Sequence, residues 1–130
     1  MQRSENRSDD RPRGRSKILV VDDDEAVRIV TAQMLRRLPL SVQCVSSGQE
    51  ALVMLNGGEY DVILLDVGMP VMSGIELYAL IRRMLPEQKV VFMTGYSEEE
   101  ITDLDNRNTW ILSKPFSMQS LTSLVGNLLA

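Results

Sequence analysis

The chain has 130 residues, of which 44% are hydrophobic and 25% are charged, and its formal net charge is −4. This length suits one domain with a single core. The acidic balance argues against direct nucleic-acid binding, since phosphate contacts need clustered Lys and Arg. There is no histidine and only one cysteine, Cys44, so the chain carries neither a phosphohistidine nor an internal disulfide. We expect a cytoplasmic protein without membrane insertion, because no apolar run approaches the ~20 residues of a membrane span.

Residues 1–16 are polar, and we predict a disordered tail or linker there. They contain no apolar residue after Met1 and carry five arginines against three acidic residues. A basic tail that contacts an anionic partner is the alternative. The folded domain is therefore expected to span residues 17–130.

Short apolar runs alternate with helical patterns from Lys17 onward. Residues 17–21 form a continuous apolar strand, and the helix that follows, 25–38, is stopped by Pro39. Residues 41–45 alternate between apolar and polar side chains, as a half-exposed strand does, and Cys44 is expected to be half-buried there. A short helix over 49–55 ends at Asn56-Gly57-Gly58.

The second half of the chain continues the alternation. Its predicted elements are a strand at 61–65, a helix at 75–85 closed by Pro86, a strand at 89–93, a short acidic helix at 97–105, a strand at 110–113 and a final helix with Ser117 as N-cap. Strict alternation of strands and helices predicts an α/β fold, with a parallel sheet covered by helices on both faces. The three most apolar strands should be central and the strand at 41–45 should lie at an edge.

Polar side chains follow four of the five predicted strands. Asp22 and Asp23 follow the first strand, Asp66 the third, Thr94 the fourth and Lys114 the fifth. Sites in open parallel sheets form beyond the carboxyl ends of the strands, so these residues should share one crevice if the strand order is 2-1-3-4-5. Clustered carboxylates without histidine suit Mg²⁺, and one carboxylate could then act as a nucleophile toward phosphorus.

The next two acidic residues, Asp24 and Glu25, allow two interpretations. They are most simply the first acids of a helix, where the helix dipole favours negative charge. Metal ligation is the alternative.

Four motifs, VVDDDE, LLDVGMP, MTGYS and SKPF, occur in this order. Together they resemble the signature of response-regulator receiver domains of two-component signalling, over about residues 17–130. The resemblance implies a flavodoxin-like, doubly wound (βα)5 fold of three layers with strand order 2-1-3-4-5. The segment MTGYSEEE also resembles receivers attached to hybrid sensor kinases.

The resemblance implies a magnesium site. Asp23 would hold Mg²⁺ directly and Asp22 largely through water. Asp66 would contribute its carboxylate, and Gly68 would contribute its backbone carbonyl.

The resemblance also assigns the phosphoryl chemistry. Asp66 would be the phosphoacceptor, Lys114 would pair first with Asp66 and then with the phosphoryl group, and Thr94 would hydrogen-bond a phosphoryl oxygen. The Lys114–Pro115 bond resembles the cis peptide of the family. By the same resemblance, Gly68 and Tyr96 would flank the attacking water, and we predict that they tune dephosphorylation.

One position departs from the family pattern. Receivers often carry an aromatic residue three positions before the lysine, and here Ile111 stands there, with Trp110 one position earlier. Whether Ile111 or Trp110 takes part in switching is left open by the sequence.

The leading hypothesis is a receiver domain that accepts a phosphoryl group from a sensor histidine kinase or a histidine phosphotransfer protein. It would be a monomer or weak dimer that catalyses only its own phosphorylation and dephosphorylation, either alone or as part of a longer protein. One alternative is a Mg²⁺-dependent phosphatase or phosphotransferase with an aspartyl intermediate, although Gly68 stands where such enzymes usually carry a second acid. The other alternative is a pseudo-receiver that binds partners without being phosphorylated.

Overall fold

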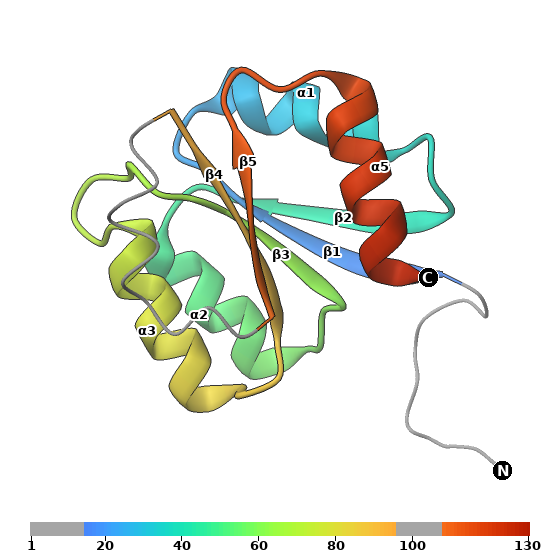
Figure 1. The fold of residues 1–130 in the computed structure, drawn as a ribbon. Helices are drawn as coiled ribbons and strands as arrows, with labels where there is room; N and C mark the ends of the chain where they lie inside the picture. Colours follow the sequence, from blue (N-terminus) through green and yellow to red (C-terminus); the bar gives the residue numbers. More distant parts are fainter. Residues whose placement is uncertain (1–14, 96–107) are drawn as a thin grey trace, which may run out of the picture.

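The computed structural model describes residues 15–95 and 108–130, which form a five-stranded parallel sheet with helices on both faces (Figure 1). The strands are β1 (Ser16–Val21), β2 (Leu40–Val45), β3 (Val62–Asp66), β4 (Lys89–Thr94) and β5 (Thr109–Ser113). The helices are α1 (Glu25–Leu35), α2 (Gly48–Gly57), α3 (Gly74–Met84) and α5 (Met118–Leu129). The strand order is β2-β1-β3-β4-β5, which confirms the predicted topology.

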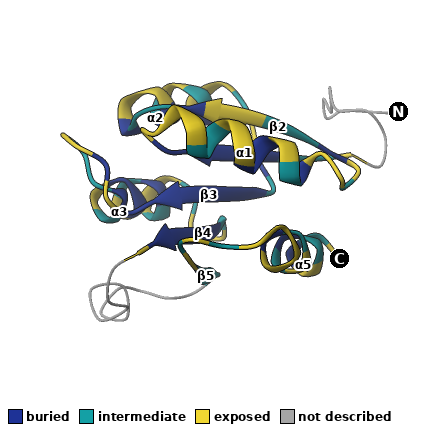
Figure 2. Ribbon diagram, turned by 90° about the horizontal axis from the view of Figure 1, so that it is seen from above, coloured by how far each residue is buried: buried dark blue, intermediate teal, exposed yellow. Residues whose placement is uncertain are grey.

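The three central strands are the three that the sequence marks as most apolar. All five residues of β3 are buried, as are the last four of β1 and the last five of β4 (Figure 2). The edge strand β2 is exposed in its middle, at Gln43 and Cys44. The expectation that Cys44 is half-buried is therefore wrong: it lies in the exposed stretch of an edge strand.

Each face of the sheet packs on its own pair of helices. Leu19, Ile63 and Phe92 belong to the cluster that includes residues of α2 and α3, and the ring of Tyr78 meets that of Phe92 edge-on at 5.1 Å. The opposite cluster joins β1, β3 and β4 to α1 and α5. Alternation along β5 places Ile111 against the first cluster and Trp110 against the second, so Trp110 does not replace an aromatic residue on the face of Ile111.

The helices begin at residues whose side chains accept hydrogen bonds from the first turn. The N-caps are Asp24, Ser47, Ser73 and Ser117, of which Ser117 was predicted. Helix α1 ends at Leu35, three residues earlier than predicted. The N–H of Leu38 donates to the carbonyl of Leu35 in a tighter turn, because the residue before Pro39 is disfavoured in the helical conformation.

Some predicted features lie outside the described residues. These are the helix at 97–105, Tyr96 and residues 1–14 of the predicted tail. Ser16, which the sequence places in the tail, is the first residue of β1. Among the helices that the structure describes, none is long and apolar enough to cross a bilayer.

The start of α3 packs closely against the end of β3. A Cβ atom on Gly74 would lie 2.2 Å from the main-chain oxygen of Asp66 and 2.8 Å from the Cα of Val67. The N–H of Gly74 also donates to the carbonyl of Val67 at 3.0 Å. Only glycine allows the helix to approach the strand end this closely.

We therefore expect Gly74→Ala to lower the free energy of unfolding by about 1–3 kcal/mol, because backbone atoms cannot move aside cheaply. Denaturant unfolding measures the change. Gly126→Ala is the matched control, since a Cβ there meets no atom within 4 Å, and it should raise stability by about 0.5–1 kcal/mol. Equal stability of Gly74→Ala and the wild type would contradict the packing described here.

Candidate functional site

The carboxyl ends of four strands bring the predicted site residues to one edge of the sheet. Asp66 is the last residue of β3 and Thr94 the last of β4, while Asp22 directly follows β1 and Lys114 directly follows β5. Asp22, Asp66 and Thr94 are buried, with 0%, 7% and 3% of their surface exposed. The N–H of Lys114 donates to the carbonyl of Thr94 at 2.8 Å, which fixes the start of the loop after β5.

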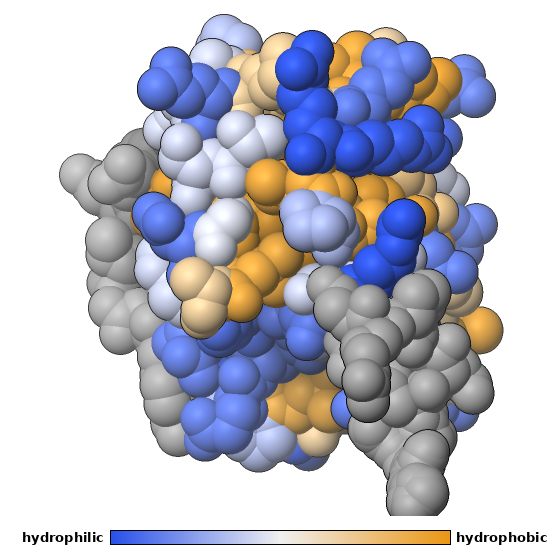
Figure 3. All heavy atoms as spheres, turned by 90° about the vertical axis from the view of Figure 1, so that its right-hand side faces the viewer, coloured by the Kyte–Doolittle hydropathy of each residue, from blue (hydrophilic) through white to orange (hydrophobic). Residues whose placement is uncertain are grey.

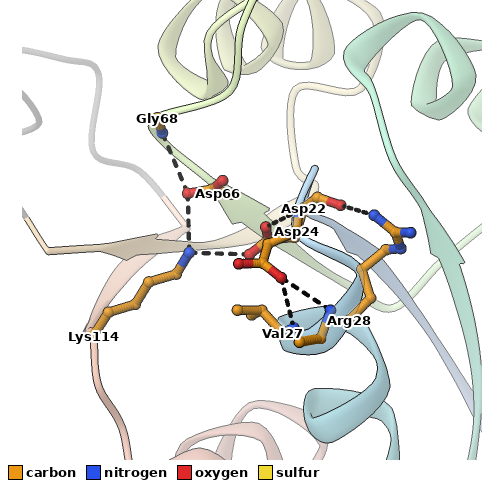
Figure 4. A network of polar contacts seen from close by, with 8 residues as sticks. Asp22, Asp24, Val27, Arg28, Asp66, Gly68 and Lys114 are labelled. Atoms are coloured by element: carbon orange, nitrogen blue, oxygen red, sulfur yellow. Dashed lines mark hydrogen bonds and ion pairs between the residues drawn. The ribbon is translucent and has the colours of Figure 1, made fainter.

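Lys114 bridges the two buried carboxylates. Its Nζ lies 3.0 Å from Oδ2 of Asp22 and 3.2 Å from Oδ1 of Asp66 (Figure 4). The pairing with Asp66 was predicted from the resemblance, whereas the direct contact with Asp22 was not. The Lys114–Pro115 peptide is cis, as predicted.

The surroundings of Asp66 disfavour the charged form of its carboxyl group. Burial raises the pKa of Asp66, and the charge of Asp22 raises it further, while Lys114 and the N–H of Gly68 act in the opposite direction without cancelling the rise. Burial disfavours the charged form of Lys114, but its hydrogen bond to Asp22 and the charges of both carboxylates outweigh that effect and raise its pKa. The ammonium group is therefore held in its charged form.

Three carboxylates converge at this edge. One oxygen each from Asp22, Asp23 and Asp66 lie within 4.8 Å of one another. Asp23 is exposed, so a cation could reach it from solvent. Three hard oxygen donors beside one ammonium suit a divalent cation that keeps several waters, and this donor set fits Mg²⁺.

Gly68 lies at the rim of the same site. Its N–H donates to Oδ1 of Asp66 at 3.2 Å, and the residue is exposed. The role of its carbonyl as a metal ligand stays a prediction.

The last two residues of the acidic run after β1, Asp24 and Glu25, begin helix α1, as the first of the two interpretations predicts. Asp24 is the N-cap of α1, with its side chain accepting from the N–H groups of Ala26 and Val27, and Glu25 lies in the first turn. The N–H of Asp24 in turn donates to Oδ1 of Asp22 at 2.9 Å. Asp24 therefore supports the site through its backbone and caps the helix through its side chain.

The sequence did not indicate Arg28, which also belongs to this network. Its Nη1 donates to the main-chain oxygen of Asp22 at 2.7 Å (Figure 4). Helical spacing places Arg28 one turn into α1, but no pattern in the sequence shows that its side chain turns back toward β1. Only the three-dimensional arrangement reveals this contact.

A groove of about 430 Å³ adjoins the site between α1 and the loop that leads into α5. It is lined by Ala26, Val27, Val30, Thr31, Met34, Lys114, Pro115 and Phe116. Figure 3 shows the right-hand side of the molecule as drawn in Figure 1, where α5 lies, and apolar side chains are exposed there between hydrophilic ones. Within the groove, Val30 is about half exposed, at 46%, and the adjacent residue of α1, Ile29, is 50% exposed.

Comparisons with known proteins agree with this geometry. The family described as "Response regulator receiver domain" matches residues 18–126. The sensor kinase CckA of Brucella abortus is 34% identical over 124 residues, which cover 89% of this chain but only 13% of that protein. The chain therefore spans a small part of this curated relative.

Two solved structures are similar over most of their length. The receiver domain of the hybrid histidine kinase CckA is 31% identical with a TM-score of 0.74, covering 88% of this chain and 99% of that one. The response regulator TrrA of Thermotoga maritima, solved in complex with Mg²⁺–BeF, is 30% identical with a TM-score of 0.78, covering 87% and 98%. Four strand ends bring the acidic residues, Thr94 and Lys114 together, and the family match covers most of the chain. The chain therefore belongs to the response regulator receiver domains of two-component systems.

Proposed function

We propose that Asp66 accepts a phosphoryl group from a phosphohistidine of a partner protein. The observation that carries this proposal is the position of the Asp66 carboxylate. It lies at the carboxyl end of β3, where it accepts a hydrogen bond from Nζ of Lys114. These 130 residues contain no histidine, so the phosphohistidine would lie outside them. That partner would be a sensor histidine kinase or a histidine phosphotransfer protein.

The hydrogen bonds around Asp66 favour one of its two oxygens as the nucleophile. Oδ1 accepts from Lys114 and from the N–H of Gly68, whereas Oδ2 accepts no hydrogen bond from the described residues. Oδ2 would attack phosphorus while the P–N bond breaks and its electron pair returns to the imidazole nitrogen. The product is an acyl phosphate on Asp66 and a histidine without phosphate.

Lys114 could pair with negative charge both before and after phosphoryl transfer. Before transfer its ammonium pairs with Asp22 and Asp66, and after transfer a phosphoryl oxygen offers a second anionic partner at the same edge. Thr94 ends the neighbouring strand, where its hydroxyl could donate to another phosphoryl oxygen. Phosphoryl transfer asks a protein mainly for such positioning and charge stabilisation.

Asp22, Asp23 and Asp66 would hold Mg²⁺, with the Gly68 carbonyl as a further oxygen. When bound, the ion would supply positive charge toward the transferring phosphoryl oxygens and relieve repulsion between the carboxylates. The convergence of three carboxylate oxygens within 4.8 Å supports this assignment.

The apolar groove beside Lys114 supports a protein, rather than a small molecule alone, as the phosphoryl donor. It places exposed apolar side chains of α1 next to the reacting edge, where a histidine-bearing helix could bind. The likeness to receivers of hybrid sensor kinases supports the same class of partner.

We further propose that the domain acts on its own phosphorylation state and on no other substrate. A cytoplasmic location, a monomeric or weakly dimeric state and the absence of nucleic-acid binding stay predictions.

Treatment with acetyl phosphate and Mg²⁺ should add one phosphate to the wild type, and Asp66→Asn should abolish the adduct because the nucleophile is gone. Intact-mass spectrometry measures it. Asp61→Asn is the matched control: it removes a carboxylate at the opposite end of β3, where Asp61 accepts from the N–H of Lys17, and it should leave the adduct unchanged. An unmodified wild type would instead favour the pseudo-receiver, and steady phosphate release from unrelated phosphate esters would favour the phosphatase.

Mg²⁺ should stabilise the wild type against unfolding, by about 2.7 kcal/mol at a concentration of about 100 Kd. Asp23→Asn should remove most of this gain, because Asp23 is the exposed ligand of the predicted site. Thermal unfolding with and without MgCl₂ provides the measurement.

Asp24→Asn is the matched control for the magnesium prediction, since asparagine caps a helix as well as aspartate does. It should keep the stabilisation by Mg²⁺. If Asp23→Asn and Asp24→Asn lose the same amount of the stabilisation by Mg²⁺, the total negative charge near the site, and not ligation by Asp23, determines the affinity for Mg²⁺.

A further inference from the structure

Asp22 is held at each of its polar atoms. Its N–H donates to the carbonyl of Val45 at 3.2 Å, Oδ1 accepts from the N–H of Asp24 at 2.9 Å, and Oδ2 accepts from Lys114 at 3.0 Å. The fourth contact is the main-chain oxygen, which accepts from Nη1 of Arg28 at 2.7 Å. A residue with no exposed surface and four such partners has its position closely defined.

The contact with Arg28 also fixes the next residue. The main-chain oxygen of Asp22 lies in the plane of the peptide that joins Asp22 to Asp23, and this plane is rigid. Holding the oxygen therefore fixes the direction in which the chain leaves Asp22 toward the Cα of Asp23. The carboxylate of Asp23 itself makes no hydrogen bond with other residues in the described parts of the chain, so its placement depends on its backbone.

Arg28 is suited to this task by its place on α1. It lies one turn into the helix, and its guanidinium spans back to the end of β1 (Figure 4). A guanidinium donor to a carbonyl is a charge-assisted hydrogen bond, which is stronger than a neutral one. Arg28 thus ties the helix to the strand at the point where the acidic pair emerges.

We propose that Arg28 is a positioning residue of the cation site, which sets the affinity for Mg²⁺ by holding the Asp22–Asp23 peptide. This inference rests on the proposed function, because it assumes that Asp22 and Asp23 serve a divalent cation. Groups that orient metal ligands through hydrogen bonds typically contribute about 10–100-fold to metal affinity.

A simpler effect of Arg28 would have the opposite sign. A guanidinium near the site carries positive charge, which repels Mg²⁺, so charge alone predicts tighter binding when Arg28 is neutralised. Positioning predicts weaker binding. The direction of the change therefore separates the two effects.

Isothermal titration calorimetry, with MgCl₂ added to the unphosphorylated protein at fixed ionic strength, measures the Kd for Mg²⁺ and tests the proposal. Arg28→Met keeps the aliphatic length of the side chain but has no donor, and it should raise the Kd for Mg²⁺ about tenfold. Arg28→Lys can still donate to the Asp22 carbonyl and should recover part of the affinity. Arg36→Met is the matched control: Arg36 is the C-cap residue of the same helix and lines the same surface groove as Arg28, but its side chain is not hydrogen-bonded to Asp22.

Arg36→Met should leave the Kd unchanged or slightly lower. The melting temperatures of all variants without Mg²⁺ serve to exclude unfolding as a cause, and Arg28→Lys keeps the test decisive if Arg28→Met is destabilised. Binding by Arg28→Met that equals or exceeds that of the wild type would overturn the inference while leaving the proposed function intact. Failure of the wild type to bind Mg²⁺ would overturn the inference and the magnesium part of the proposed function together.

Discussion

One ammonium group placed between two buried carboxylates is the interaction on which the site depends. Lys114 lies 3.0 Å from Asp22 and 3.2 Å from Asp66, and without it two negative charges would share a buried edge with no cation. Such charges are costly to bury unless they are paired and hydrogen-bonded. The raised pKa of Asp66 shows that Lys114 relieves this cost only in part. The remaining excess of negative charge favours a divalent cation at the carboxyl ends of the strands.

The rest of the fold delivers these three residues to one place. Three neighbouring parallel strands, β1, β3 and β4, are buried on both sides. The carboxyl ends of β1 and β3 lead to Asp22 and Asp66, and the end of β5, which pairs with β4, leads to Lys114. Gly74 lets α3 begin directly against the end of β3, so the backbone that carries Asp66 is supported from behind. Arg28 does the same for the backbone of Asp22 from α1. Rigid support of this kind is what positions a nucleophile for transfer.

Much of this arrangement could be predicted from the sequence. The alternation of strands and helices predicted the parallel sheet, and the apolar character of three strands predicted that they are central. The polar residues after four of the five strands predicted the shared site. The sequence could not predict which atoms individual side chains contact. The contact of Lys114 with Asp22 and that of Arg28 with the Asp22 carbonyl depend on rotamers and on the distance between elements. The exposure of Cys44 depends on which part of the edge strand the neighbouring elements cover. The early end of α1 reflects local competition between helix and turn before Pro39.

The cost of holding the Asp66 carboxylate in the folded site is measured most directly by comparing the unfolding free energies of the wild type and Asp66→Asn as a function of pH without divalent cations. Because the pKa of Asp66 is raised in the folded state above its ordinary value of 3.8, ionisation of Asp66 disfavours folding. The wild type should therefore lose stability relative to Asp66→Asn as the pH rises from about 3.8 through the folded-state pKa, and this loss should persist at about pH 7. Below the ordinary value the difference should stop changing with pH. A difference that is independent of pH, or a wild type that gains stability relative to Asp66→Asn over this range, would mean that the fold does not oppose ionisation of Asp66.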